Sequence, residues 1–368
     1  MITGLRTGPA QTWGAVRLVP LLRDEPITDL RLHARLAGPD LSIVDLGGRA
    51  HYVAYVPHAF VATWSTDGTP AAAYGTQLLD PREPGLPRVA GLRFRRRMAR
   101  REDRTRLRFL PLHLALEGYL DLQFGGPPIA WQEWTRAAVT RGLSPRVEEA
   151  YRGEEVRGLD DALRVFEVHP GQCGVAVYLA DALASVFAVP HPDDYLALHP
   201  TLLHDFYGEL LYHYTQLYPA VAGFDQPLDA AAVHTVDDLR AELTRVRGEW
   251  AAFHNEVMFT VHASTTLPVY RLGRFTLARF LPPFDPATDN HIGEMITTPD
   301  GTVAYLKTFR LSAAQARRGH LLSRLAGHDW SLDATAASLG TDRAGLVLRL
   351  ERAGFGYLLR PGVVPARS

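Results

Sequence analysis

The longest regular pattern in the sequence is a helical repeat of apolar residues that runs from Val236 to Val257. Apolar side chains recur there at every third or fourth residue, the spacing that places them on one face of an α-helix. Thr235 and Asp238 form a start similar to a capping box. The pattern predicts one long amphipathic helix. Its apolar positions are Val236, Leu239, Leu243, Val246, Trp250, Phe253 and Val257.

The first third of the chain has the composition of β-strands. Its apolar segments are rich in β-branched and aromatic residues, and Gly47-Gly48 and Asp67-Gly68 separate them as turns. This pattern predicts a β-rich N-terminal region. The predicted strands lie in Val16–Leu22, Leu41–Leu46, His51–Trp64 and Arg104–Phe124.

The middle of the chain mixes predicted helices and strands. Pro200–Leu217 has a helical apolar stripe, and proline suits the first turn of a helix because it has no amide hydrogen to leave unpaired. Pro299-Asp300-Gly301 predicts a turn within the last strand segment. The predicted strands are Cys173–Leu179, Ala184–Val189, Val269–Leu281 and Gly293–Phe309.

The residues after Leu311 are predicted to form three helices. Ser312 and Gln315 make a second capping box, Ser331 opens the next helix, and Thr341 is expected to cap Asp342–Arg352. The last two helices resemble a Fis-type helix-turn-helix, in which a glycine, an arginine three residues on and leucines six and ten residues on recur. The matching residues are Gly340, Arg343, Leu346 and Leu350.

A DNA-reading helix needs polar and basic side chains on its exposed face. Val347 and Leu348 stand at positions that would be exposed in such a helix. This favours a packing or partner-binding module, with DNA binding as the alternative. The candidate DNA-binding residues are Arg343, Arg349 and Arg352.

These patterns predict an α+β protein with three parts. Residues 1–225 are expected to form a β-rich α+β domain, and residues 226–310 a helix-plus-strand region. Residues 311–368 are expected to form the three-helix, helix-turn-helix-like unit.

Composition and charge exclude several classes of protein. Apolar residues make up 46% and charged residues 21% of the 368 residues, as in an ordinary globular protein. The formal net charge of −1 gives no overall basic field that would draw the chain onto nucleic acid or a membrane. The sequence contains no apolar run long enough for a membrane span and no signal-peptide pattern, and Cys173 is its single cysteine. A cytoplasmic protein without membrane contact is expected.

Several common catalytic motifs are missing from the sequence. Lys307 is the only lysine, and no glycine-rich loop ends in Lys-Ser/Thr, which excludes a P-loop nucleotide site. The sequence has no Gly-x-Ser-x-Gly, Gly-x-Gly-x-x-Gly or His-Glu-x-x-His motif. A Schiff-base mechanism would have to use Lys307, which lies in a strand pattern. No cofactor is expected.

The segment His191-Pro192-Asp193-Asp194 follows a predicted strand and is similar to the metal loop of zinc-dependent N-acetylglucosaminyl deacetylases. In that family the histidine and the second aspartate bind zinc, which implies His191 and Asp194 as candidate metal ligands. Where the family has a glutamate next, this chain has Tyr195. The alternative is structural, with the aspartates capping a helix and the prolines shaping the loop.

Two groups of polar side chains are further candidates. His204 and Asp205 lie on the polar face of the predicted helix, where a solvated face is the alternative. An arginine-rich stretch, together with His113 and Glu117, offers paired donors for an anionic ligand such as a phosphate, with a basic surface loop as the alternative. The candidate ligand-binding residues are Arg93, Arg95, Arg96, Arg97 and Arg104.

Several distinctive segments lie in the first two thirds of the chain. They are Gly14–Leu22, Phe109–Gly118, Phe124–Pro127, Val168–Val177 and His199–Tyr207. With these segments the chain resembles the ARG-and-rhodanese-phosphatase-superfamily-associated proteins of the second type, and its Gly-Gln-x-Gly-Val strand also resembles the first type. The resemblance implies an association with ADP-ribosylglycohydrolases and phosphatases in bacterial NAD- or ADP-ribose-linked systems. It assigns no catalytic residue.

Three functions follow from these features. The leading hypothesis is an accessory protein in NAD-, ADP-ribose- or nucleotide-linked metabolism or conflict, which binds a small phosphate-bearing ligand or a partner protein. The first alternative is a hydrolase that acts on an anionic nucleotide derivative through His113, Glu117, His204 and Asp205. The second is a DNA-binding regulator that uses the C-terminal unit.

Overall fold

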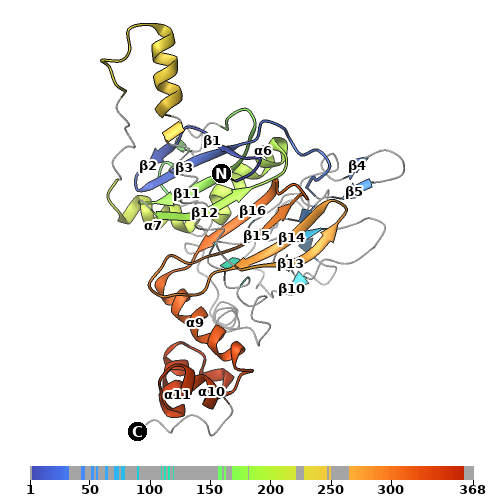
Figure 1. Ribbon diagram of the computed structural model, residues 1–368, viewed down its shortest axis with the longest axis vertical. Coiled ribbons are helices and arrows are strands. Elements are labelled where there is room, and N and C mark those ends of the chain that lie inside the picture. Colours follow the sequence, from blue (N-terminus) through green and yellow to red (C-terminus); the bar gives the residue numbers. More distant parts are fainter. Residues whose placement is uncertain are drawn as a thin grey trace.

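The computed structural model (Figure 1) describes residues 2–32, 168–180, 182–220, 228–246, 248–249 and 265–359. Between residues 33 and 167 it describes short strands and single residues. These are 43–45, 51–53, 55–56, 63–64, 70–73, 76–78, 89–90, 109, 112, 115–116, 119, 156–159 and 161–162. The described chain combines a large sheet with helices in the middle and at the C-terminal end, which confirms the predicted α+β class.

A nine-stranded antiparallel sheet forms the centre of the molecule. Its order is β1-β3-β11-β12-β16-β15-β14-β13, with β2 paired to β3 beside this path. The pairing of β12 with β16 places strands from residues 1–225 and from residues 226–310 in one sheet, and the division between these segments stays a prediction. The strands are β1 (Arg6–Thr7), β2 (Gln11–Trp13), β3 (Val16–Leu22), β11 (Gln172–Leu179), β12 (Ala182–Ala188), β13 (Thr265–Leu272), β14 (Phe275–Leu281), β15 (His291–Thr297) and β16 (Val303–Arg310).

Short strands from the first third of the chain form three further small sheets. In these sheets β4 pairs with β5, β6 pairs with β9, and β8 lies between β7 and β10. They agree with the predicted β-rich start of the chain. The strand predicted in Arg104–Phe124 is wrong where this segment is described, because residues 112, 115, 116 and 119 are helical. The strands are β4 (Ile43–Asp45), β5 (His51–Val53), β6 (Tyr55–Val56), β7 (Thr63–Trp64), β8 (Pro70–Ala73), β9 (Gln77–Leu78) and β10 (Val89–Ala90).

Three neighbouring strands of the sheet are covered on both faces. Every residue of β3 and β11 is buried, and β12 is buried after its first residue. Nearly continuous apolar runs are typical of strands that lie between two layers. The predicted strands in this part of the chain are confirmed.

Two glycines turn the hairpins at the other edge of the sheet. Gly301, at φ +83°, lies in the connection between β15 and β16, where the Pro-Asp-Gly turn was predicted. Gly273, at φ +54°, turns the chain between β13 and β14. The prediction of a single strand over 269–281 is therefore wrong, because one glycine within an apolar run suffices to reverse the chain.

The helical segment after β12 begins earlier than predicted. Helix α6 (Pro192–Thr201) has Pro192 in its first turn and His191 as its N-cap, with the Asp193 amide donating to His191 Nδ1 at 3.2 Å. Pro200 lies inside α6, and the chain continues through the π-helical η2 (Leu202–Phe206) into α7 (Gly208–Leu217). The prediction that a helix starts at Pro200 is wrong, because Pro192 occupies the first turn instead. The separate expectation that Asp193 or Asp194 caps a helix start is wrong as well, because His191 is the cap and both aspartates lie in the first turn.

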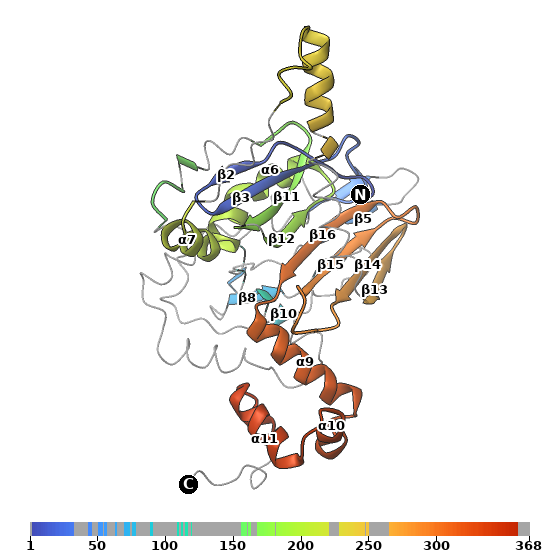
Figure 2. The same ribbon diagram turned by 60° about the vertical axis from the view of Figure 1, so that its left-hand side comes forward.

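The predicted amphipathic helix is present over residues 236–246 and 248–249 and projects beyond the sheet (Figures 1 and 2). Its cap forms as predicted: the Asp238 amide donates to Thr235 Oγ1 at 3.1 Å and the Thr235 amide to Asp238 Oδ2 at 2.8 Å. The predicted continuation to Val257 lies outside the described residues. The described apolar side chains of Val236, Leu239 and Leu243 are exposed.

Three α-helices and a short 3-10 helix form the C-terminal unit around a core of their own. The Ser312–Gln315 capping box forms as predicted, and Asp342, not Thr341, caps α11. Val347 is buried, so its predicted place on the exposed face is wrong, whereas Leu348 is exposed. The helices are α9 (Ala313–Gly327), α10 (Leu332–Ser338), α11 (Arg343–Arg352) and η3 (Gly356–Leu358). The core consists of Leu321, Leu322, Leu325, Ala336, Leu346, Leu350 and Phe355.

Three charged residues lie side by side across adjacent strands of the sheet. Arg279 of β14 pairs in register with Glu294 of β15, and Glu294 pairs with Lys307 of β16. Lys307 Nζ lies 3.3 Å from Glu294 Oε1, and Arg279 Nε lies 3.9 Å from Glu294 Oε2. The side chains of Glu294 and Lys307 are fully buried. The single lysine of the sequence is therefore a core residue, held by a carboxylate on the next strand.

Residues from the first third of the chain bind to this charge row. The Thr76 amide donates to Glu294 Oε1 at 2.7 Å, and the Thr76 hydroxyl donates to the same oxygen. The Tyr119 hydroxyl donates to the carbonyl oxygen of Gly293. These bonds fasten residues 76 and 119 to the sheet.

Removing one partner of the Glu294–Lys307 pair is expected to destabilise the protein strongly. Lys307→Met leaves a buried carboxylate and Glu294→Leu a buried amine, and each change is expected to lower the free energy of unfolding by about 3–5 kcal/mol. The double variant should recover part of that loss because no unpaired charge remains. Urea unfolding followed by fluorescence measures all three. Arg271→Met, an exposed change on β13, is the control, and equal losses in the single and double variants would contradict the pairing.

Lys307 should also make stability depend on pH. Burial lowers the pKa of the Lys307 ammonium to about 8, against an opposing effect of Glu294. The unfolded chain keeps the proton up to about pH 10.4. Between these values the unfolded state binds more protons, so the contribution of Lys307 to the free energy of unfolding rises with pH. The difference between wild type and Lys307→Met, measured by urea unfolding from pH 7 to 10, is expected to rise, and a flat difference would contradict the assignment.

Candidate functional site

A cavity of about 430 Å³ lies where α7 passes the junction of β16 and α9. This volume lies in the range of small-molecule sites in proteins. Polar groups from α7 and from the start of α9 line it together with an apolar surface. The apolar lining consists of Leu112, Leu116, Leu179, Ala184, Leu210, Leu217 and Leu311.

The π-helical turn η2 determines which face of α7 meets the cavity. The Tyr207 amide donates to the Leu202 carbonyl at 3.1 Å, a bond that encloses one residue more than an α-helical turn. Within this turn Leu203 and Phe206 are buried in the core. After it Tyr214 and Leu217, which belong to the same predicted apolar stripe, line the cavity instead. Tyr214 still packs in part against the main core, whereas Leu217, at the end of the stripe, is exposed.

Residues of α7 at helical spacing supply one wall of the cavity. Glu209, Leu210, His213, Tyr214 and Leu217 recur at intervals of three and four, so they share one face. Glu209 Oε1 lies 3.9 Å from His213 Nε2, which places an acceptor and an imidazole on the same wall. This wall offers hydrogen bonds to hydroxyl groups next to an apolar surface.

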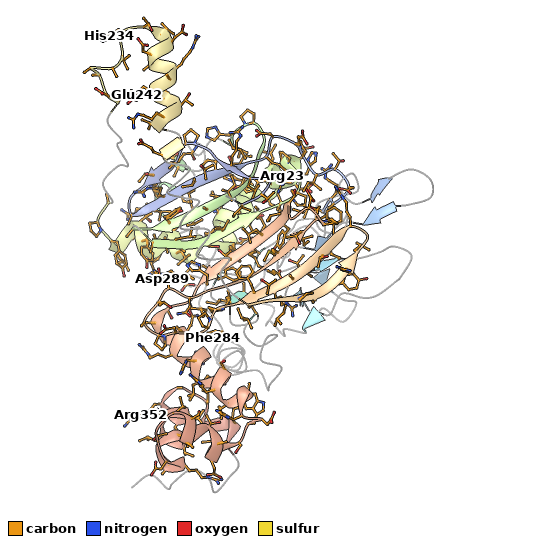
Figure 3. The ribbon with its side chains drawn as sticks, in the orientation of Figure 1. Arg23, His234, Glu242, Phe284, Asp289 and Arg352 are labelled. Carbon is orange, nitrogen blue, oxygen red and sulfur yellow. The ribbon has the colours of Figure 1, made fainter. Side chains whose placement is uncertain are left out.

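Arg310 supplies a cation at the end of β16. Its Nη2 donates to Asp289 Oδ1 at 2.7 Å, and its side chain is 39% exposed. Figure 3 shows Asp289 beside the connection between the sheet and α9. A guanidinium has five N–H donors, so one bond to Asp289 leaves others for an anion in the cavity.

The first turn of α9 opens on the same cavity through Ser312 and Gln315. Within the capping box the Gln315 amide donates to Ser312 Oγ at 3.2 Å, and the Ser312 amide donates to Gln315 Oε1 at 2.9 Å. The start of a helix carries partial positive charge from its aligned peptide dipoles. Arg310 and this helix start therefore place positive charge at one side of the cavity.

Two tyrosines on α7 present aromatic surface. The rings of Tyr214 and Tyr218 stack with centroids 4.5 Å apart and planes 12° apart, and both residues line the cavity. Tyr218 is 52% exposed. Aromatic surface of this kind suits the face of a planar ring.

Most of the predicted catalytic and anion-binding residues lie away from this cavity or outside the described residues. His204 and Asp205 belong to η2, ahead of the cavity wall, and are not among the lining residues. His113 and Glu117 lie outside the described residues, although Leu112 and Leu116 on either side of them line the cavity. The predicted anion-binding arginines Arg93, Arg95, Arg96, Arg97 and Arg104 lie outside the described residues as well.

The predicted metal residues His191 and Asp194 lie at the start of α6. Asp194 is fully buried and holds Arg31 through both carboxylate oxygens, at 3.0 to 3.3 Å, and it also accepts from the Leu32 amide. Burial raises the pKa of Asp194 to about 6, against the opposing effect of Arg31. The described residues contain no group of three or more histidine, cysteine, aspartate or glutamate side chains that would hold a metal ion.

The candidate DNA-binding arginines lie on the exposed surface of α11. Arg343 Nη1 lies 3.1 Å from Asp333 Oδ2 of α10, which ties the two helices together. Arg349 and Arg352 are exposed in its last turns, on either side of the buried Leu350. Leu348 lies exposed among them, so the surface is part basic and part apolar.

Sequence reasoning missed the charged and polar end of the cavity. It interpreted Ser312 and Gln315 as a cap alone and did not single out Arg310. A signal was present, because an arginine that ends a strand directly before a capped helix lies near that helix's positive end. What the sequence could not show is that α7 packs opposite this junction.

Comparison with known proteins places most of the chain in one family. The ARPP-2 family model matches residues 1–273, which include α7 and all residues before it. The curated proteins and the solved structures yield no match to the chain. In the part of the chain that the structure describes, every helix is too short or too polar to cross a lipid bilayer.

Proposed function

The chain belongs to the ARPP-2 family, and we propose that it binds a phosphate-bearing nucleotide derivative in the cavity between α7 and α9. As a member of this family it is an accessory protein of the ADP-ribosylglycohydrolase and rhodanese-phosphatase system. The observation that carries the proposal is the joint presence of Arg310, the start of α9 and the tyrosine-bearing wall of α7 around one cavity.

The positive side of the cavity suits a phosphate. Arginine recognises phosphate oxygens through paired N–H donors, and the start of a helix attracts anions. Arg310 and the first turn of α9 supply both features within one cavity. Since the chain carries a net charge of −1, this attraction is local and not a property of the whole surface.

The wall of α7 suits the rest of a nucleotide. Tyr214 and the leucines offer a ring face and apolar surface for a base, and Glu209 offers an acceptor for ribose hydroxyls. ADP-ribose and related compounds combine these groups with phosphate. The proposal therefore favours such a ligand over free inorganic phosphate.

Ligand binding is expected to raise the melting temperature of the full chain, because a ligand that binds the folded state alone stabilises it. Thermal unfolding is measured with ADP-ribose, NAD, AMP and inorganic phosphate, and titration calorimetry gives the affinity of any compound that stabilises the protein. ADP-ribose is expected to give a larger shift than phosphate. A flat response to all four compounds at millimolar concentration would contradict the proposal.

Arg310→Gln is expected to weaken this binding by about tenfold or more, since a hydrogen bond to a charged group contributes about 1.5–3 kcal/mol. Asp289→Asn is the matched control, because it removes the same ion pair and leaves the guanidinium in place. The control should bind at least as tightly as wild type. An equal loss of affinity in both variants would assign Arg310 a structural role only. Chromatography of the ligand after incubation with the protein shows whether the ligand is bound intact or hydrolysed.

A further inference from the structure

The charge row of Arg279, Glu294 and Lys307 contains more polar atoms than its own contacts satisfy. In the part of the chain that the structure describes, Arg279 Nε, Glu294 Oε2 and Lys307 Nζ are buried without a hydrogen-bond partner. The ion pairs of the row join these side chains only at 3.9 Å and 3.3 Å. Buried polar groups are normally hydrogen-bonded, so three exceptions at one place call for an explanation such as a catalytic role or a bound molecule.

The surroundings of Lys307 make its amine a nucleophile. Its side chain is fully buried, and Nζ lies 5.4 Å from the centroid of the Phe309 ring. Burial lowers the pKa of Lys307 to about 8, and Arg279 acts in the same direction against the opposing effect of Glu294. Proteins activate lysines by burial and by a neighbouring cation, because only the neutral amine attacks. At pH 8 about half of Lys307 is neutral, compared with about a hundredth or less of a lysine in an unfolded chain.

Glu294 and Arg279 supply two further groups that a reaction of this amine needs. Glu294 Oε1 lies 3.3 Å from Nζ, within reach of a proton on the nitrogen, and the Thr76 amide holds this oxygen in place at 2.7 Å. The Arg279 side chain is 19% exposed, so the row reaches the surface at its guanidinium. Guanidinium N–H groups bind carboxylates and phosphates. None of these residues lines the cavity at α7, so this cluster is separate from the ligand site proposed there.

We propose that the Lys307 amine forms a Schiff base with a small aldehyde or keto compound whose carboxylate or phosphate group is bound by Arg279. Glu294 takes one proton from the ammonium, and the amine lone pair attacks the carbonyl carbon. A nitrogen–carbon bond forms, and the carbonyl oxygen receives that proton from Glu294. The oxygen then leaves as water with a second proton from the nitrogen, so the ammonium and the carbonyl compound give a protonated imine and water.

Reductive trapping on the wild-type chain tests the Schiff base. The full chain is incubated at pH 8 with glyoxylate, a small aldehyde with one carboxylate, and with sodium cyanoborohydride, which reduces an imine to a stable amine. The intact mass is expected to rise by one carboxymethyl group. Since Lys307 is the only lysine, peptide mapping distinguishes its modification from that of the N-terminal amine, and no variant that fails to fold is needed. An unmodified Lys307 would overturn the proposal.

The rate of trapping separates an activated lysine from one that is only buried. The rate of modification of Lys307 is measured in the folded chain and in the chain unfolded by guanidinium chloride, both at pH 8. The folded chain is expected to react about tenfold faster or more, because a larger fraction of its amine is neutral. Burial alone would protect the amine. A slower reaction in the folded chain would therefore contradict the proposal.

The role of Arg279 is tested by the choice of aldehyde. Arg279→Gln is expected to lower the ratio of the trapping rates with glyoxylate and with acetaldehyde about tenfold, since it removes a hydrogen bond to a charged group. The ratio cancels any change in the pKa of Lys307 that the variant causes. Arg271→Gln, an exposed change on β13, is the matched control and should leave the ratio unchanged. An equal ratio in the two variants would overturn the assignment of Arg279 as the anion-binding group.

Discussion

The pairing of β12 with β16 holds together two stretches of chain that lie far apart in the sequence. On one side it carries the hairpin of β11 and β12, and on the other the meander from β13 to β16. Phe187 and Lys307 lie opposite each other in this pairing. Phe187 also packs edge-on against Phe109 and Tyr305 at about 6 Å between ring centroids. Backbone hydrogen bonds and aromatic contacts therefore together join the two halves of the sheet.

The charged residues Arg279, Glu294 and Lys307, on β14, β15 and β16, constrain the register of the sheet. Burying Glu294 and Lys307 costs desolvation energy that their attraction offsets only in a close geometry. A slip of one residue between β15 and β16 would send the two side chains to opposite faces and leave both charges unpaired. Apolar strands slide past one another at smaller cost. We infer that the row fixes the register of the meander, and that the register in turn sets where β16 ends.

Local signals predicted the elements whose structure is decided locally. The Thr235 and Ser312 caps and the Pro299-Asp300-Gly301 turn are each encoded within a few residues, and they form as expected. The helix start at Pro192, the π-turn at Leu202 and the burial of Val347 depend on packing against distant elements. Lys307 could be placed on a strand from sequence, but Glu294 could not be named as its partner, because strand register is a property of the whole sheet.

The two walls of the cavity could also be predicted locally, but their contact could not. The α7 wall was visible in the sequence as an apolar stripe, and the α9 wall as a capped helix, yet only the fold brings the two together. Helix α9 contributes to both cores. Ala316 in its first turns packs in the main core together with Leu311, which precedes the helix, and Leu322 and Leu325 pack in the C-terminal core.

At Gly319, α9 packs closely against the body of the protein. A side-chain carbon there would collide with the ring of Phe284, a residue whose backbone has φ +53°, so only a glycine allows the helix this close to the body. Figure 3 shows Phe284 beside α9. The proposed ligand, bound by Arg310 and the start of α9, would therefore contact the same helix that contributes to the C-terminal core.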